Sequence, residues 1–234
     1  MVFQFDTKWT IEQAAPIGPQ IFKIMRERII RNDLEPGSRI SESEIAADFS
    51  VSRQPVREVF IKLAEEGLLE VRPQRGTFVR KISISAVMDA RFVREAIEAD
   101  IVKLLAKNKD AVLAIELRKQ LAKQRKVAAR DPVHFMELDE KFHWMLAEAA
   151  GKAYAWNVVE SVKSQMDRVR HLNLSTQKFS TKNLIEQHTT IVEAISAGDE
   201  AGAETAMRGH LREILNDLPA IAEANPEFFE NAGK

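Results

Sequence analysis

Four residues in the second half of the chain have side chains that bind divalent metal ions. Asp139 and His143 are four positions apart, so on a helix their side chains project from one face, one turn apart. His188 and His210 follow on two later helices, each beside apolar residues that a helix would bury. An antiparallel bundle can bring three helices to one point. One carboxylate and three imidazoles suit zinc, nickel, manganese or iron, so these residues are candidate ligands of one metal site.

Two other interpretations of these residues compete with a ligand site. A buried histidine is more often a hydrogen-bonded core residue or helix cap, so the cluster could simply pack in a metal-free dimer domain. A metal with open positions could instead activate water in a helical metallohydrolase or oxygenase. The sequence lacks a His-Glu-x-x-His helix and the paired Glu-x-x-His motifs of a di-iron bundle, so we expect no enzyme. His134 and His171, near helix ends, have no apparent partner set and are expected to take no part.

A second set of residues, in the first half of the chain, could contact nucleic acid. Ser52 can cap a helix that begins at Arg53, and Gln54 and Arg57 lie on its first two turns. A recognition helix presents such residues to base edges in the major groove. Arginine pairs with guanine there, and glutamine with adenine, each through two hydrogen bonds. These residue types at the start of a helix therefore favour DNA binding.

A short two-stranded ribbon is expected after this helix. Residues 68–71 and 77–79 are β-type runs, and Arg75, beside flexible Gly76 at the tip, could enter the minor groove or hold a phosphate. A helix-turn-helix followed by such a wing is a DNA-binding layout. The alternative is a helical hairpin with a solvated charged face, and residues 21–81 carry only 12 basic against 10 acidic residues. The placement of the basic residues, rather than their number, favours the winged helix-turn-helix.

The hydrophobic periodicity predicts a mainly α fold in two domains. We expect an N-terminal arm at 1–15 and a winged helix-turn-helix of three helices and a small β-wing at 16–80. A linker at 81–85, an all-α antiparallel bundle at 86–218 and a loosely ordered tail at 219–234 would follow. The bundle helices are expected at 85–107, 110–130, 132–150, 153–174, 181–197 and 200–217.

Composition excludes several classes of protein. The 234 residues are 45% hydrophobic and 29% charged with a formal net charge of -1, so contact with nucleic acid must come from a local patch. There is no cysteine, which rules out disulfides and thiolate metal sites and fits a reducing cytoplasm. The N-terminal segment does not look like a secretory signal, and no run is long enough for a membrane span.

The segment 36–79, PGSRISESEIAADFSVSRQPVREVFIKLAEEGLLEVRPQRGTFV, resembles the N-terminal domain of the GntR family of bacterial transcriptional regulators. In that family the first arginine of the recognition helix, the arginine of the Pro-Val-Arg-Glu run and the wing glycine region contact DNA. The resemblance assigns these roles to Arg53, Arg57 and Arg75 with Gly76. Ser43 stands where some members have a basic contact residue, so we expect that contact to be absent here.

The segments LDEKFHWMLAEAAG, QHTTIVEAISAGD and AMRGHL resemble the C-terminal ligand-binding domain of the FadR subfamily, the all-helical FCD domain. Many such domains bind a metal through one aspartate and three histidines at these motif positions. All four are present, as Asp139, His143, His188 and His210. The resemblance therefore implies a divalent metal ion. Zinc is the expected ion in a purified sample, with nickel, manganese and iron as alternatives.

The same resemblance implies an effector. In members with the metal, a small carboxylate completes the coordination and reaches an arginine on the first helix of the domain; Arg94, in VREAIEADIV, matches that position. A guanidinium pairs with a carboxylate through two hydrogen bonds, which a lysine does not reproduce. The alternative for Arg94 is a surface ion pair with Glu95 or Glu98. Arg168 and Arg170 are further candidates for contact with the effector.

Together these features predict a cytoplasmic DNA-binding regulator, a repressor, controlled by a small organic or sugar acid. A homodimer on a palindromic double-stranded operator is expected, because one winged helix covers one half-site. A long acyl chain would leave the polar pocket residues without partners, so we do not expect such a ligand. The acid can act only by favouring one arrangement of the domains or of the dimer over another. We expect the linker at 81–85 to transmit this change of arrangement.

Overall fold

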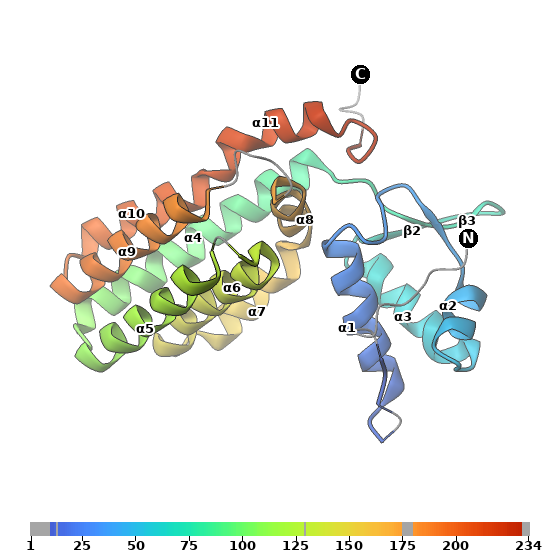
Figure 1. Cartoon of the computed structure of the whole chain (residues 1–234), viewed down its shortest axis with the longest axis horizontal. Coiled ribbons are helices and arrows are strands. Elements are labelled where there is room, and N and C mark those ends of the chain that lie inside the picture. The colour runs from blue at the N-terminus through green and yellow to red at the C-terminus, as the bar shows by residue number, and fades with distance from the viewer. Residues whose placement is uncertain (1–9, 13, 129, 175–179, 231–234) are drawn as a thin grey trace. The chain divides into compact units, whose positions relative to one another are not determined.

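The computed structural model describes residues 10–12, 14–128, 130–174 and 180–230. The chain forms two compact units, the first made of Met1–Ser83 with Asn225–Lys234 and the second of Ile84–Ala224 (Figure 1). The chain therefore passes from one unit to the other twice. Most of the arm expected at 1–15 lies outside the described residues. Among the described residues, no helix has the length and apolar character that crossing a membrane requires.

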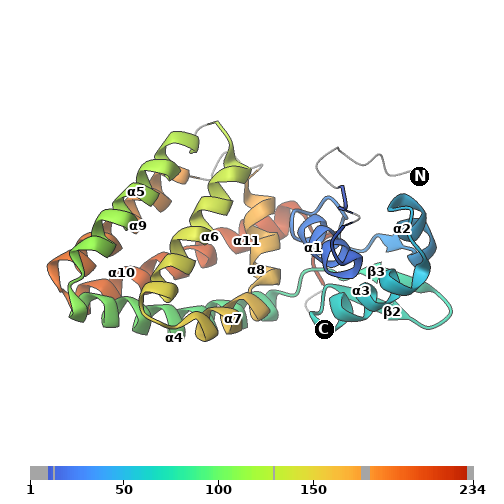
Figure 2. The ribbon, with the colours of Figure 1, turned by 90° about the horizontal axis from the view of Figure 1, so that it is seen from below.

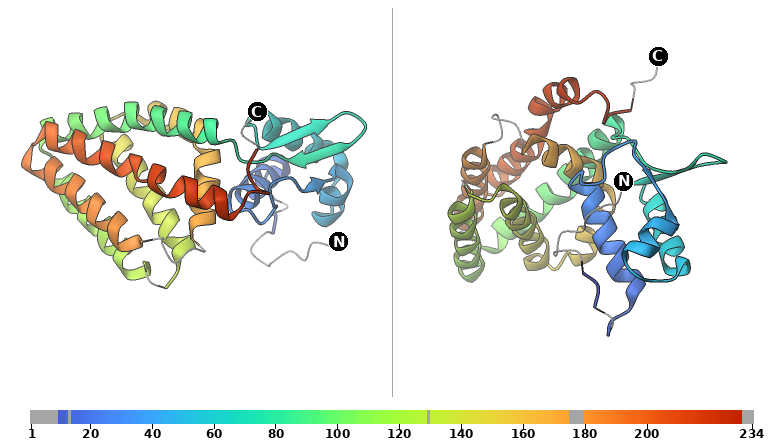
Figure 3. Two further views of the ribbon diagram at one scale, coloured as in Figure 1. Left: turned by 90° about the horizontal axis from the view of Figure 1, so that it is seen from above. Right: turned by 45° about the vertical axis from the view of Figure 1, so that its right-hand side comes forward.

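The N-terminal unit is a winged helix-turn-helix, as predicted. Its helices are α1 (Ile17–Ile30), α2 (Glu42–Asp48) and α3 (Arg53–Glu65), and its strands are β1 (Arg39–Ile40), β2 (Leu69–Arg72) and β3 (Gly76–Val79). The antiparallel sheet has the order β1-β3-β2. Figure 3 shows the ribbon of β2 and β3 projecting beyond the helices of its own unit. Strand β1 was not expected, because two residues are too few to show an alternating pattern.

The helices of this unit form because their apolar residues recur at helical spacing. Ile21 and Met25 of α1 are fully buried against a core that includes Val56 and Leu63 of α3. Gly67, with φ of 68°, takes the left-handed conformation just after α3 that a side chain would disfavour.

The C-terminal unit is the predicted all-α bundle. Its helices are α4 (Ile84–Asn108), α5 (Ala111–Val127), α6 (Pro132–Ala149), α7 (Ala153–Val162), α8 (Ser164–Asn173), α9 (Thr181–Ala197), α10 (Glu200–Arg212) and α11 (Ile214–Ala224). Helix α4 packs against α6, α7, α8, α9 and α10, and α5 packs against α6 and α9. The Asp131 carboxylate caps α6 by accepting from the His134 N–H (2.9 Å). Gly198, at φ of 74°, ends α9 before the cap Asp199 of α10.

The single helix expected at 153–174 is two helices. Lys163, between α7 and α8, has ψ of -9°, whereas an α-helix requires about -42°. Figure 2 shows α8 running across the direction of α7. The Lys163 ammonium is buried at the bend and pairs with Asp167 (2.5 Å) and Glu140 (3.0 Å). These two carboxylates compensate its positive charge. Sequence periodicity does not reveal the bend, because the residues on both sides favour helix.

The helix expected at 200–217 also differs, because α10 ends at Arg212 and α11 continues to Ala224. Pro219 lies inside α11, although proline usually ends a helix by removing a backbone donor. Leu218 and Ile221 are buried and hold this segment in the bundle. Packing therefore outweighs the local preference, and the expectation of a loosely ordered tail from 219 was wrong for this stretch.

Residues 225–230, which we name the C-terminal strap, return to the N-terminal unit. The Ile82 N–H donates to the Phe228 carbonyl (2.8 Å), and the Glu230 N–H donates to the Ile82 carbonyl (2.9 Å). Phe229 and Ile82 are buried, and Arg80 pairs with Glu230 (3.0 Å). The expected linker at 81–85 is thus partly structural, since Ile82 pairs with the strap and α4 begins at Ile84.

We predict that Phe229→Ala destabilises the N-terminal unit. Replacement of a buried phenylalanine by alanine removes apolar contacts and costs about 3–5 kcal/mol in the free energy of unfolding. Urea titration with hydrogen exchange read at the amides of α1, α3 and β3 measures the change. Glu230→Ala is the matched control, because its ion pair with Arg80 is solvent-exposed and should cost less than about 1 kcal/mol. Equal stability of the two variants would contradict a structural role for the strap.

Candidate metal centre and DNA-contact surface

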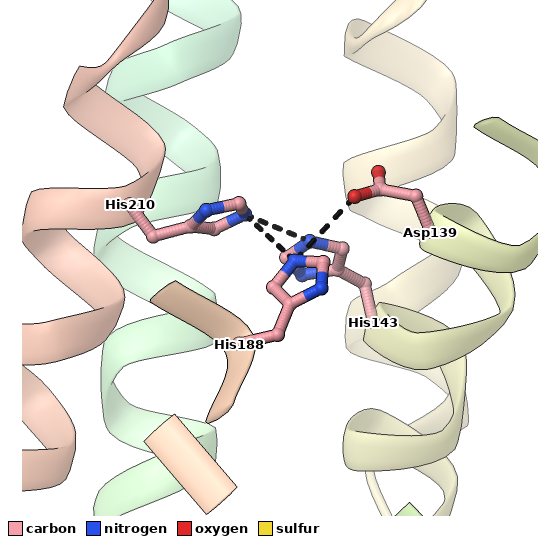
Figure 4. Close-up of side chains that lie close together, drawn as sticks. All are labelled: Asp139, His143, His188 and His210. Carbon is pink, nitrogen blue, oxygen red and sulfur yellow. Dashed lines mark hydrogen bonds and ion pairs between the residues drawn. The ribbon is translucent and has the colours of Figure 1, made fainter. Parts of the chain in front are cut away.

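The four candidate ligands, far apart in the sequence, meet at one point of the bundle (Figure 4). Helix α6 supplies Asp139 and His143, α9 supplies His188, and α10 supplies His210. The Nε2 atom of His210 lies 3.1 Å from that of His143 and 3.3 Å from that of His188. The Asp139 Oδ1 atom lies 3.4 Å from the His188 Nε2 atom. All four side chains are buried, and one ligand atom from each lies within 4.8 Å of the others.

The His143 ring is held by an ionised carboxylate. Its Nδ1–H donates to Glu98 Oε2 (2.5 Å), and the other oxygen of Glu98 accepts from the Arg94 Nε–H (2.6 Å). Burial acts to raise the pKa of Glu98, but Arg94 and His143 outweigh it and lower this pKa to about 2. An ionised carboxylate can only accept, so Nδ1 of His143 carries the proton that it donates to Glu98, and Nε2 faces the other candidate ligands.

The other two rings are held by glutamine side chains. His188 Nδ1–H donates to Gln124 Oε1 (3.1 Å), and His210 Nδ1–H donates to Gln187 Oε1 (2.8 Å). Gln124 Nε2 donates to the Leu138 carbonyl (3.1 Å), which fixes the orientation of that amide. Outer hydrogen bonds of this kind set the tautomer and the direction of metal-binding histidines.

Burial keeps these imidazoles neutral. It lowers the pKa of His188 to about 3. Burial, with the neighbouring His188 and His143, also lowers the pKa of His210. Burial alone would raise the pKa of Asp139, but Arg170 and the imidazoles outweigh it and hold this pKa well below the usual range. At neutral pH the centre therefore presents two uncharged rings and an ionised carboxylate, the states that bind a metal.

The donor set fits a divalent cation. The three imidazole Nε2 atoms face one another at hydrogen-bond distance, an arrangement that a positively charged partner between them would satisfy. Asp139 Oδ1 is buried and accepts no hydrogen bond from any described residue, while Oδ2 accepts from Arg170. Two ligands at the usual zinc distance and tetrahedral angles are about 3.4 Å apart, close to the separations observed here.

A cavity of about 100 Å³ adjoins the cluster. Its polar lining includes Arg94, Arg170, Asn173, Asn183, His210 and Asp217. The Arg94–Glu98 ion pair that the sequence left as an alternative does form, but it is buried rather than at the surface, and Arg94 also lines the cavity. Arg168 is fully buried and does not line the cavity.

The candidate DNA-contact residues of the recognition helix lie on the solvent side of α3. Ser52 occupies the N-cap position, but its side chain does not cap the backbone. Arg53, Gln54 and Arg57 are exposed. Arg53 pairs with Glu42 (3.4 Å) and Gln54 donates to Glu58 (3.0 Å), so both would have to exchange an internal partner for DNA.

The wing residues also lie at the surface. Arg75 is exposed beside Gly76, whose φ of 103° favours glycine. A Cβ at Gly76 would come within 2.9 Å of Arg39 Nε. Glycine at this position therefore leaves room for the Arg39 guanidinium of β1. The sequence pattern does not reveal Arg39 as a wing residue, because the pairing of β1 with β3 brings it there.

The sequence also missed the residues that orient the imidazoles. Glu98, Gln124 and Gln187 belong to helices α4, α5 and α9, and no motif links them to the histidines. His134 lies outside the centre, exposed and 3.0 Å from Glu137. His171 does not belong to the cluster.

Comparison with known proteins agrees with both halves of this description. Residues 18–79 match the bacterial regulatory proteins of the gntR family, and residues 89–213 match the FCD domain. The chain belongs to the GntR family of regulators and carries a C-terminal FCD domain. This GntR regulator is 38% identical to the HTH-type transcriptional repressor RspR of Escherichia coli (strain K12), over 92% of its own length and 94% of that protein.

Solved structures share the fold of this GntR regulator. A GntR-type regulator from Rhodococcus sp. RHA1 aligns with a TM-score of 0.72 and 25% identity, over 87% of this chain and 98% of that one. E. coli McbR/YncC aligns with a TM-score of 0.73 and 17% identity, over 90% of this chain and 99% of that one. GntR regulators bind DNA operators and FCD domains bind small-molecule effectors, so the protein is a transcriptional regulator and not an enzyme.

We predict that His188→Ala abolishes metal binding by this GntR regulator. Wild-type protein incubated with zinc and then desalted should hold about one ion per chain by elemental analysis, because four ligands converge on one point. His188→Ala removes a ligand from the centre. His134→Ala, which changes an exposed histidine, is the control and should keep the wild-type content. Zinc retained in full by His188→Ala would contradict the site.

Proposed function

We propose that this regulator is a repressor whose operator affinity is controlled by a small carboxylate bound at a divalent-metal centre. The observation that carries the proposal is the convergence of three oriented imidazoles on the buried Asp139 oxygen. Asp139, His143, His188 and His210 would hold the ion, with zinc, nickel, manganese or iron fitting the donor set. The bound ion would offer open coordination positions to a carboxylate oxygen. Arg94, on the wall of the adjoining cavity, would receive the acid.

The N-terminal unit supplies the DNA contacts in this proposal. Arg53, Gln54 and Arg57 would meet base edges and phosphates in the major groove, and Ser52 would hold a phosphate at the start of α3. Arg75 beside Gly76 would reach the neighbouring minor groove. The E. coli relative is named a repressor, which supports that direction of control. We place the protein in the FadR subfamily and in the bacterial cytoplasm, where its operator would be.

Chain connectivity offers a route from the acid to the DNA. Ile214 and Asp217 of α11 line the cavity, and α11 leads directly into the strap that pairs with Ile82. Ile82 in turn follows the wing strand β3 closely in the chain. A ligand shifts the DNA-binding equilibrium only if it favours one arrangement of the protein over another. Helix α11 would carry such a shift, because it lines the cavity and continues into the C-terminal strap.

A homodimer would read a palindromic operator, and one surface of the bundle suits a second copy. Ile84, Met88 and Phe92 recur at four-residue spacing on α4, and Phe92 is 66% exposed. Helix α7 lies beside α4 (Figure 2) and adds Tyr154, which is 81% exposed, and Val158. A run of exposed apolar side chains over two adjacent helices is typical of a protein interface.

We predict that a small carboxylate releases DNA only from metal-loaded protein. Duplexes selected from a random library by the wild-type protein provide the probe, and fluorescence anisotropy measures affinity. In the zinc-loaded wild type, the active acid should weaken DNA binding by roughly 5- to 150-fold, the usual range of allosteric coupling. In His188→Ala the same acid should have no effect, because its coordination site is lost.

Arg57→Ala is the control for the DNA signal in this experiment. It should weaken DNA binding by about 1–3 kcal/mol without acid and leave zinc content unchanged. Equal release from wild type and metal-free His188→Ala would remove the metal from the mechanism. Failure of every carboxylate to release DNA would remove effector control.

We predict that Phe92→Glu converts the dimer to a monomer. The substitution places a charge in the centre of an apolar interface, where it would be buried without a partner. Sedimentation equilibrium measures the mass. Val112→Glu is the matched control, because Val112 is also apolar and exposed but lies on α5, and it should remain dimeric. A dimeric Phe92→Glu variant would exclude the α4–α7 surface.

A further inference from the structure

Most arginines of the N-terminal unit already have a place inside the protein. Arg28 is buried, and five others pair with a glutamate side chain: Arg26, Arg31, Arg53, Arg72 and Arg80. Arg39, Arg57 and Arg75 are exposed, and their side chains make no hydrogen bond or ion pair with another described residue. Arg57 and Arg75 contact DNA in the proposed function. Arg39 has an equally free guanidinium but no assigned role.

The Arg39 side chain extends along the wing toward its tip. The Arg39 Cα lies opposite Phe78 of β3, whereas the guanidinium lies beside Gly76, two residues nearer the turn. A Cβ at Gly76 would be 2.9 Å from the Arg39 Nε and 3.4 Å from its Nη2. Two residues of an antiparallel strand rise about 7 Å, so the side chain carries its charge roughly that far toward the tip. Arg75 directly precedes Gly76 there.

The other arginine beside β3 is engaged within the wing. Arg72 of β2 pairs with Glu70 (3.0 Å) and lies over the Phe78 ring, 4.5 Å from its centroid. Glu70 is the only acid in the sequence from 67 to 81, so this pair uses the single carboxylate of the ribbon. Arg39 and the tip arginine are left without one, and two exposed guanidiniums without a carboxylate are suited to an anionic partner.

The anion that this surface fits is the minor groove of DNA. GntR regulators bind DNA operators, and in the proposed function, on which this inference rests, Arg75 reaches the minor groove. An A·T-rich minor groove is narrow, and its enhanced negative potential attracts arginine side chains. Two guanidiniums at one wing can follow such a groove, while the recognition helix occupies the neighbouring major groove.

We propose that Arg39 enters the minor groove beside Arg75 and gives the operator a preference for A·T pairs where the wing binds. Gly76 is required for this contact, because a side chain there would occupy the space of the Arg39 guanidinium. Arg39 is thus a specificity-determining residue from outside the recognition helix, and it reads the width of the groove rather than base edges.

The test begins by locating the wing on DNA. Hydroxyl-radical footprints of full-length wild type and Arg75→Ala are compared on a duplex selected by the wild type from a random library. The base pairs that lose protection in Arg75→Ala are the wing positions. New duplexes then carry A·T, G·C or inosine·cytosine pairs at these positions. Inosine lacks the minor-groove amino group of guanine but keeps its major-groove acceptors, so it isolates the minor groove.

Fluorescence anisotropy on these duplexes measures the contribution of Arg39. Wild type should bind the A·T and inosine duplexes roughly tenfold more tightly than the G·C duplex, and Arg39→Ala should lose this preference. The variant should also lower the slope of log affinity against log salt by about 1, because one cation is removed. Arg118→Ala is the charge-matched control, because it removes an exposed arginine of α5, and it should change neither quantity.

Gly76→Ala tests whether the glycine makes room for Arg39. It should also abolish the A·T preference, because the new Cβ displaces the guanidinium. Alanine strains a backbone with φ of 103° as well, so the double variant with Arg39→Ala separates the two causes. In the Arg39→Ala background, Gly76→Ala should cost less than about threefold in affinity. Circular dichroism checks that each variant is folded.

The outcomes separate this inference from the proposed function. Wild-type affinity and preference in Arg39→Ala, with binding still weakened in Arg57→Ala, would overturn the inference and leave the proposed function in place. Equal weakening of Arg39→Ala on all three duplexes would mean a phosphate contact and would overturn the minor-groove contact. Additive costs of Arg39→Ala and Gly76→Ala would overturn the role of Gly76. Unchanged protection in Arg75→Ala would overturn the proposed wing contact itself.

Discussion

Four polar atoms converge in the interior of the helical bundle, and their hydrogen bonds organise much of what surrounds them. The Nδ1–H groups of His143, His188 and His210 each donate to an oxygen on Glu98, Gln124 or Gln187. Those bonds turn the three Nε2 atoms inward, toward Asp139. Polar atoms and a carboxylate without partners are costly in a buried site, so the arrangement suits positive charge. Arg170 supplies part of it to Asp139, and a divalent ion would supply the rest.

The bend between α7 and α8 lies next to this charge. Helix α8, which follows the bend, carries the Arg170 that pairs with Asp139. Lys163 at the bend is itself buried and compensated by Asp167 and Glu140. The charges near the centre are thus paired locally, so in the function proposed here the carboxylate of the bound acid would bring the negative charge that compensates the ion.

The C-terminal strap gives the two units a second covalent connection. A single linker at 81–85 would leave the wing to respond only through α4. The strap instead joins the end of α11 to Ile82, next to the wing strand. In the function proposed here, one element thus lines the acid-binding cavity and continues into the DNA-binding unit.

Periodicity and turn chemistry were enough to predict most of the fold. The apolar spacing, Asp131–Pro132 and Gly198–Asp199 placed the bundle helices close to where they lie, because these signals are local. They failed at Lys163 and Pro219, where packing outweighs local preference. They also missed β1, whose two residues pair only with a strand far along the chain.

For the site, the sequence by itself determined which residue types were available and how Asp139 and His143 are spaced on one helix. It also determined, through motifs, that His188 and His210 are their partners. Only the tertiary structure decided that Glu98, Gln124 and Gln187 orient the rings and that Arg94 is buried. The physical reason is that a hydrogen bond between helices depends on crossing geometry, which no spacing along one helix encodes.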